Sequence, residues 1–409
     1  MTSASAGLYV HFPYCVSICS YCDFDRQATG FASIPRYVAS VVAEIGMQQR
    51  RPIHSIFFGG GTPSLMAGDQ VRAILSAASE KLDVLPGAEI TLEANPGECA
   101  VDRLSAFRAA GVNRLSIGVQ SLDDATLQKL SRRHTADDAR AAMKAAREAG
   151  FDNVSLDFML GLSGMTVETW LATLDAAVAL SPEHLSCYIL TVDERVPMGR
   201  DVARGRLVLP SDDEIAEQYL ATGERLAAAG YQQYEISNWA RLGRPSRHNL
   251  TYWRDEPYLG IGAGAAGWVD GVRTKNTPSP RRYMSSVAAG QVERVEEERP
   301  DLPTRLGDAL ALGLRLREGI DLDGLSARLD ADVRSAVGPA LDELLEVGCL
   351  EWHDGRLRVA DSSILVTSEL LVRIETALEA WRDSLARASG VADAQTRAQL
   401  ADRPVPAGR

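Results

Sequence analysis

Along the first half of the chain, short runs of β-branched and aromatic residues alternate with longer segments whose apolar residues recur at helical spacing. Six short runs lie at residues 8–11, 53–58, 89–94, 114–120, 153–160 and 184–190. Between them, residues 35–50 place Pro35 in a first helical turn, and residues 101–111 place Gly111 at a C-cap. Successive β/α units of this kind predict an α/β fold, built as an open, partial (β/α)6 barrel.

Polar and glycine residues gather where the predicted strands end. Three cysteines follow the first strand, Gly59–Thr62 follows the second, Glu93 ends the third, Gln120 ends the fourth, and Asp157 lies in the fifth. In β/α barrels the carboxyl ends of the parallel strands converge on one mouth, where the reactive groups collect. We therefore expect one functional site at this end of the barrel.

The rest of the chain predicts further elements and a second domain. Residues 196–280 are less regular, with a helix expected over 212–229 and then a polar, aromatic run. From residue 302, three helical patterns precede two strand-like runs around a turn at Asp354–Gly355. We expect four parts, which are the barrel (1–240), a connecting region (241–300), a smaller α+β domain of winged-helix type (301–386) and a disordered tail (387–409).

The composition restricts the class of protein. The 409 residues are 45% hydrophobic and 24% charged, which is ordinary for a globular protein with a large core. A formal net charge of -12 and a pI near 5.1 argue against a protein that mainly neutralises nucleic-acid phosphates. The N-terminus lacks the pattern of a secretion signal, and no run of about 18 apolar residues occurs. We expect a cytoplasmic protein with no nucleic-acid partner and no membrane span.

Half of the six cysteines, Cys15, Cys19 and Cys22, form the spacing C-x3-C-x2-C directly after the first predicted strand. In a reducing compartment, clustered cysteines bind metal or react more often than they form disulfides. Thiolates suit zinc or an iron–sulfur cluster. A structural zinc site needs a fourth protein ligand, for which His11 is the only nearby candidate, whereas three cysteines on a four-iron cluster leave one iron open. The spacing favours a 4Fe-4S cluster.

This motif, placed after the first strand of a partial barrel, resembles that of the radical S-adenosylmethionine (SAM) superfamily. The resemblance implies that the three cysteines hold a 4Fe-4S cluster whose open iron binds SAM. It also implies that reduction of the cluster cleaves SAM and releases a deoxyadenosyl radical. The segment GGGTPS, from Gly59 to Ser64, is similar to the superfamily's glycine-rich loop, where absent side chains let the backbone approach SAM.

The resemblance narrows to one family over nearly the whole chain. The oxygen-independent coproporphyrinogen III oxidases and the related heme chaperones of the HemW subfamily have runs similar to LYVHFPYC, FFGGGTPS, EANP, GVNRLSIGVQSL, HLSCYILT and HNLTYW. In this family two SAM molecules can occupy the barrel mouth. The resemblance implies that the cluster-bound SAM is contacted by Tyr9, Gly60 and Glu93. It implies that a second SAM is contacted by Tyr21, Gly61, Thr62, Gln120, Arg132 and Asp157.

Two features separate the oxidases from the chaperones. The oxidases carry a further cysteine two residues after the third, where this chain has Phe24. The chaperones carry H-N-x-x-Y-W, which is present here at residues 248–253. In that motif His248 can supply an axial ligand to heme iron, and Tyr252 and Trp253 can cover the macrocycle. Relatives usually carry a histidine where this chain has Ala266, which removes one candidate contact to a porphyrin.

We therefore expect a radical SAM heme chaperone that binds heme and passes it to an acceptor protein, expected among the heme enzymes of respiration. A reductant for the cluster is a further expected partner. Two enzyme activities remain as alternatives, namely oxidative decarboxylation of coproporphyrinogen III and methyl transfer from a second SAM. The sequence assigns no catalytic residue. It leaves open whether a second SAM binds, whether heme is attached covalently and whether any radical reaction is catalysed.

Overall fold

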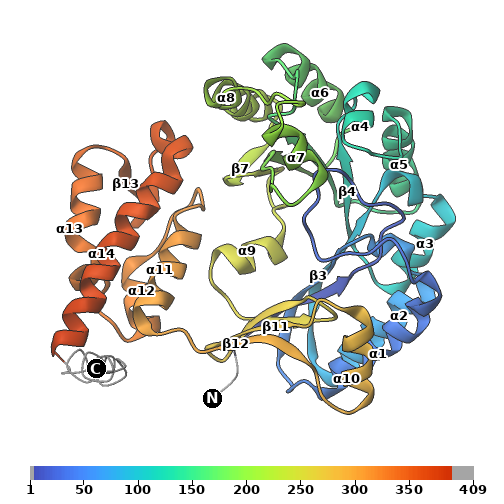
Figure 1. Cartoon of the computed structure of the whole chain (residues 1–409), viewed down its shortest axis with the longest axis horizontal. Coiled ribbons are helices and arrows are strands. Elements are labelled where there is room, and N and C mark those ends of the chain that lie inside the picture. The colour runs from blue at the N-terminus through green and yellow to red at the C-terminus, as the bar shows by residue number, and fades with distance from the viewer. Residues whose placement is uncertain (1–3, 389–409) are drawn as a thin grey trace, which may run out of the picture. The chain divides into compact units, whose positions relative to one another are not determined.

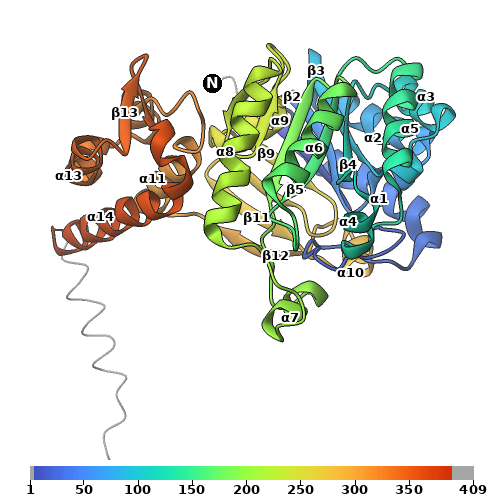
Figure 2. The same cartoon turned by 90° about the horizontal axis from the view of Figure 1, so that it is seen from above.

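The computed structural model describes residues 4–388 of the chain. The chain divides into two compact units, Met1–Arg299 and Pro300–Arg409. Figures 1 and 2 show the elements of both units from two directions. The disordered tail predicted from residue 387 lies, from residue 389 onward, outside the described residues.

Six parallel strands form the centre of the first unit, as the hydrophobic pattern predicts (Figure 1). They are β1 (Ala6–Phe12), β2 (Pro52–Gly60), β3 (Asp83–Ala94), β4 (Arg114–Gln120), β5 (Val154–Leu160) and β6 (His184–Ile189). The strands lie in sequence order, and each pairs in parallel with the next. This order confirms the predicted partial (β/α)6 barrel.

The helices between these strands lie on the outer side of the curved sheet (Figure 1). They are α1 (Ile34–Met47), α2 (Gly68–Lys81), α3 (Val101–Ala110), α4 (Asp124–Lys129), α5 (Ala136–Glu148) and α6 (Val167–Ala179). Pro35 lies in the first turn of α1, and Gly111, with φ 119°, terminates α3, as predicted. Thr135 and Thr166 cap the N-termini of α5 and α6 with their side chains. One face of the sheet is thus covered, and the other lines the barrel interior.

Further strands extend this sheet at both edges. The remaining elements of the unit are α7 (Pro197–Ala203), α8 (Asp212–Ala228), β7 (Gln232–Glu235), β8 (Asn238–Ala240), α9 (Arg247–Trp253), β9 (Tyr258–Ile261), β10 (Ala266–Val269), β11 (Val272–Asn276), α10 (Pro280–Ala288) and β12 (Arg294–Glu298). β8 pairs with β6 at one edge, and β9 pairs in parallel with β1 at the other. Residues 241–300 therefore add strands to the main sheet, and the run HNLTYW is helical.

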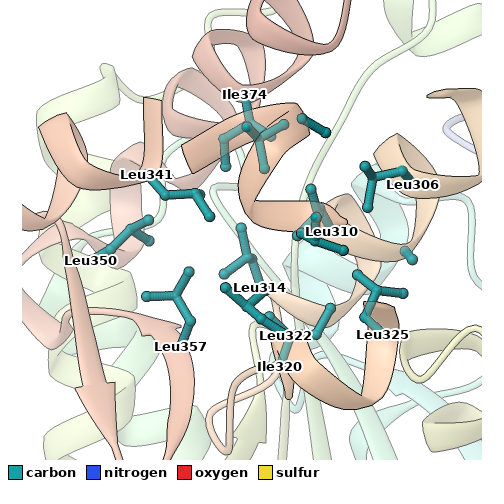
Figure 3. Close-up of a cluster of buried hydrophobic side chains, with 14 of the residues drawn as sticks. Leu306, Leu310, Leu314, Ile320, Leu322, Leu325, Leu341, Leu350, Leu357 and Ile374 are labelled. Atoms are coloured by element: carbon teal, nitrogen blue, oxygen red, sulfur yellow. The ribbon is translucent and has the colours of Figure 1, made fainter. Parts of the chain in front are cut away.

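The second unit combines helices with a two-stranded hairpin. Its elements are α11 (Leu302–Gly313), α12 (Leu322–Leu329), α13 (Val333–Glu346), β13 (Leu350–His353), β14 (Arg356–Val359) and α14 (Thr367–Ala388). Asp354 and Gly355 have φ values of 47° and 77°, so the predicted hairpin turn is confirmed. Leu310, Leu341 and Leu357 belong to one apolar core that joins the helices to the hairpin (Figure 3). Within residues 4–388, no helix is long and apolar enough to cross a membrane.

Candidate functional site

One cavity of about 940 Å³ in the first unit collects the residues that the sequence assigned to the cluster and to SAM, together with the candidate heme ligand His248. These residues are Tyr9, Cys15, Cys19, Tyr21, Cys22, Gly60, Gly61, Thr62, Glu93, Gln120, Arg132, Asp157 and His248. They come from β1, the loop after it, the end of β2, strands β3 to β5, the segment after α4, and α9. The fold thus brings distant segments together at the mouth that the strand ends predict.

The loop after β1 carries the three cysteines as free, partly exposed thiols. Thr62 Oγ1 donates to Cys15 Sγ over 3.5 Å, and Arg132 Nη1 donates to Cys19 Sγ over 3.6 Å. Burial raises the pKa of the Cys15 and Cys22 thiols. Without a metal these two side chains are therefore protonated, and a metal that binds them has to displace protons.

Gly60 and Gly61 lie where the loop after β2 packs against the loop after β1. A Cβ at Gly61 would lie 2.7 Å from the carbonyl oxygens of Phe12 and Tyr14. A Cβ at Gly60 would lie 2.4 Å from the His11 ring, and the φ of 107° at this residue is rare for L side chains. The absent side chains therefore bring two loops of the protein together, a role that the sequence did not indicate.

Two carboxyl groups, Glu93 on β3 and Asp157 on β5, face the cavity and are partly exposed to it. Glu93 Oε2 accepts a hydrogen bond from the Gly60 N–H over 3.1 Å. Burial, followed by the charge of Asp157, raises the pKa of Glu93 to about 8, so Glu93 is protonated at neutral pH. Burial also raises the pKa of Asp157. This shift is opposed by hydrogen bonds of 2.7 to 2.9 Å that Asp157 accepts from the hydroxyls of Ser116, Ser155 and Ser186.

Gln120 and Arg132 are held in specific conformations beside these carboxyl groups. Gln120 ends β4 with φ 66°, a left-handed conformation that costs a non-glycine residue on the order of 1 kcal/mol. Arg132 Nη2 donates to the side-chain oxygen of Asn95 and to the carbonyl of Gly118, both at 2.6 Å. The Arg132 guanidinium thus already has protein acceptors, and a ligand carboxylate would have to replace one of them.

His248 lies in the first turn of α9 and is 1% exposed. Its ring stacks beside those of Phe57 and Tyr9, with centroids 5.2 and 6.4 Å away. Both ring nitrogens have partners, because Nδ1 lies 2.9 Å from Ser55 Oγ and Nε2 lies 2.9 Å from the Tyr252 hydroxyl. Burial lowers the pKa of His248 to about 3, so the imidazole is neutral. A neutral imidazole can bind iron, but one nitrogen must first leave its partner.

Some residues fall outside this site, and others join it. Trp253 and Ala266 do not line the cavity, and Ala266 is exposed at the start of β10. Arg114, His184 and Tyr234 do line the cavity, although the sequence did not assign them. Alternate side chains on a strand face the same side. The positions of Arg114 on β4 and His184 on β6 could therefore have predicted that both face the barrel interior.

The chain is similar in sequence to known proteins. Residues 9–177 match the family model of the Radical SAM superfamily, and residues 301–366 match that of the HemN C-terminal domain. The chain is 32% identical to the heme chaperone HemW of Bacillus subtilis, over 88% of this chain and 97% of that protein. It is 38% identical to the mitochondrial radical S-adenosyl methionine domain-containing protein 1 of Mus musculus, over 93% of this chain and 90% of that protein. Fold and site together define a radical SAM protein. Within that superfamily, the chain belongs to the HemW family.

The solved structure of coproporphyrinogen III oxidase (HemN) from Escherichia coli has the same fold. It matches with a TM-score of 0.78 and covers 92% of this chain and 91% of its own, at 22% sequence identity. The likeness therefore extends over the barrel and the C-terminal unit, each taken by itself. At this identity it establishes the fold, whereas the chemistry has to be argued from the residues.

Membership of the superfamily implies a 4Fe-4S cluster and SAM, and the residues present fit both. No three His, Cys, Asp or Glu side chains of residues 4–388 are placed to hold a single metal ion. A four-iron cluster does not need three side chains placed around one ion, because each cysteine binds a separate iron. Cys15, Cys19 and Cys22 would hold the cluster, and Glu93 and Asp157 offer acceptors to SAM. When bound and reduced, the cluster supplies the electron that cleaves SAM.

Proposed function

We propose that this protein is a heme chaperone, which binds heme in the cavity of the first unit and passes it to an acceptor protein. The observation that carries the proposal is the continuity of the cavity, which reaches from the three cysteines to His248 and Tyr252 on α9. The cluster residues and the candidate heme ligand therefore share one cavity. The relatives named as heme chaperones support the same function.

Phe24 supports the chaperone over the oxidative decarboxylase. It lines the cavity beside the cysteine loop and is 63% exposed, where the related oxidases carry a further cysteine. An exposed aromatic ring offers an apolar face to a macrocycle and no ligand to iron. Val16 and Ile18 on the same loop are also exposed and line the cavity, so the mouth presents apolar surface to a flat ligand.

In this proposal His248 is the axial ligand of the heme iron. The neutral imidazole suits that role, and Tyr9 and Phe57 hold its plane by stacking. Ligation requires Nε2 to leave the Tyr252 hydroxyl, while Ser55 continues to hold Nδ1 and fixes the orientation of the ring. A cytoplasmic reductant for the cluster and a respiratory heme enzyme as acceptor complete the proposed set of partners.

The decisive test is an anaerobic titration of heme into cluster-reconstituted protein, followed by absorption. We expect saturable binding to the wild type and binding weakened about tenfold or more in His248→Ala, because the axial ligand is lost. His353→Ala is the matched control, since His353 is an exposed histidine of the second unit and should leave the affinity unchanged.

Three outcomes would contradict the proposal. Absence of saturable heme binding would remove its basis. Heme binding together with conversion of coproporphyrinogen III, in which two propionate side chains lose their carboxyl groups as carbon dioxide, would favour the oxidase. Appearance of S-adenosylhomocysteine during turnover would favour a methyltransferase.

A further inference from the structure

Arg114 is a charged residue of the cavity that neither the cluster nor SAM explains. It is the first residue of β4, is 2% exposed and lines the cavity. Ser116, Gly118 and Gln120 follow at alternate positions and also line the cavity, so this face of β4 looks into the barrel. Arg114 therefore lies on the floor of the cavity, at the end of β4 opposite to Gln120.

Within residues 4–388, the guanidinium of Arg114 has no hydrogen-bonded or ion-paired partner that would account for its burial. Its Nε is buried and forms no hydrogen bond within the described chain. Glu93 and Asp157 feel its charge, but the hydrogen bonds that they accept come from the Gly60 N–H and from serine hydroxyls. Glu93 is moreover protonated at neutral pH. Because a buried cation without a hydrogen-bonded counter-ion is costly, a bound anion is the expected partner of the guanidinium.

The polar groups near Arg114 hydrogen-bond to one another and leave it free. His184 Nδ1 lies 2.8 Å from Ser155 Oγ, and His184 Nε2 lies 2.9 Å from the Tyr234 hydroxyl. Asn249 donates to the same hydroxyl over 3.2 Å. Burial and then the charge of Arg114 lower the pKa of His184, and for His248 the charge of Arg114 contributes after burial and the charge of His54. The free cation therefore lies within electrostatic reach of the candidate heme ligand.

We infer that Arg114 forms a carboxylate-binding site on the floor of the cavity, which takes a propionate of the bound heme. A planar guanidinium can pair with a carboxylate through two parallel hydrogen bonds, which fixes both affinity and orientation. The methionine carboxylate of SAM has the same chemistry, but Arg132, next to the cysteine loop, is better placed for it. The assignment to heme rests on the proposed function, and it orients the macrocycle with a propionate toward the floor.

The test compares heme with heme dimethyl ester, in which both carboxylates are esterified. The ratio of the two affinities is measured on one preparation at a time, so it does not depend on how much of a variant folds. The wild type should bind heme about 10- to 100-fold more tightly than the ester. Arg114→Gln should bind both equally, and Arg114→Lys should keep part of the preference as a point charge. Arg133→Gln is the matched control, because it removes the same charge from an exposed residue of the cavity lining.

An unchanged preference for heme in Arg114→Gln, or its loss in Arg133→Gln instead, would overturn the inference. Equilibrium dialysis of SAM with the same variants distinguishes the two sources of carboxylate. A large loss of SAM affinity in Arg114→Gln, with the preference for heme intact, would assign the site to SAM and overturn the assignment to a propionate. If the wild type bound neither porphyrin, the proposed function itself would fail, and the SAM affinities would then show whether Arg114 binds a carboxylate at all.

Discussion

His248 Nε2 lies 2.9 Å from the hydroxyl of Tyr252, one turn further along α9. Ser55 Oγ lies at the same distance from Nδ1. A neutral imidazole donates from one nitrogen and accepts at the other, so both of its hydrogen-bonding positions are filled. Tyr252 therefore competes for the nitrogen that heme iron would take, and the proposed ligation has to open this hydrogen bond.

Removal of the Tyr252 hydroxyl should strengthen heme binding. In Tyr252→Phe, Nε2 is left free, and the cost of about 1 kcal/mol for opening a buried hydrogen bond disappears. We expect heme to bind roughly fivefold more tightly in the anaerobic titration. Tyr258→Phe is the control, because Tyr258 packs edge-on against Tyr252 with ring centroids 4.7 Å apart. Weaker binding in Tyr252→Phe would mean that the hydroxyl contacts heme and does not compete with it.

The fold was largely predictable because buried parallel strands form continuous apolar runs. All six predicted strands are present, and β3 shows where the pattern was insufficient. It begins at Asp83, whereas the pattern predicts a start at residue 89, because Pro86 and Gly87, with φ 73°, interrupt the apolar run. The pairing of β2 with β3 shifts register at the same place. Tertiary pairing thus extends a strand through residues with low strand propensity.

The site was predictable as a set of residues, but its hydrogen bonds were not. The rule of strand ends and the family resemblance selected side chains that the structure places around one cavity. The partners that occupy His248, however, include Ser55, which is 193 positions away in the chain. Arg114 was missed because an arginine at the start of a strand is usually exposed, and only the folded barrel shows that it is buried.

Substitution of Cys19 by alanine should prevent assembly of the cluster. The three thiolates act together, so the loss of one leaves a second iron of the cluster without a protein ligand. We expect iron and acid-labile sulfide per chain to fall to a small fraction of the wild-type values after reconstitution. Cys349→Ala, in the second unit, should leave both unchanged. Full iron content in Cys19→Ala would refute the cluster assignment for this residue.

A methyl group at Gly61 should separate the two loops that form the cluster side of the cavity. In Gly61→Ala the Cβ would lie 2.7 Å from two carbonyl oxygens, which cannot move without disturbing the loop after β1. We expect the free energy of unfolding to fall by about 1–3 kcal/mol and iron incorporation to fall with it. Gly97→Ala is the control, since Gly97 also lines the cavity and its Cβ would meet nothing within 4 Å. Equal behaviour of the two variants in thermal unfolding and iron content would contradict this account.

The raised pKa of Glu93 predicts that SAM binding releases a proton. With a pKa of about 8, Glu93 is mostly neutral at pH 7, and the sulfonium charge of SAM beside it would lower that pKa and favour the carboxylate. Isothermal titration of SAM in two buffers of different ionisation enthalpy should therefore show close to one proton released by Glu93 at pH 7. The SAM affinity should rise with pH up to about 8 and then level off, because Glu93 is by then already ionised before SAM binds.

Glu93→Gln has no proton to release at this position, so the difference from the wild type isolates the contribution of Glu93. The same proton release in both proteins would show that Glu93 is not ionised by SAM.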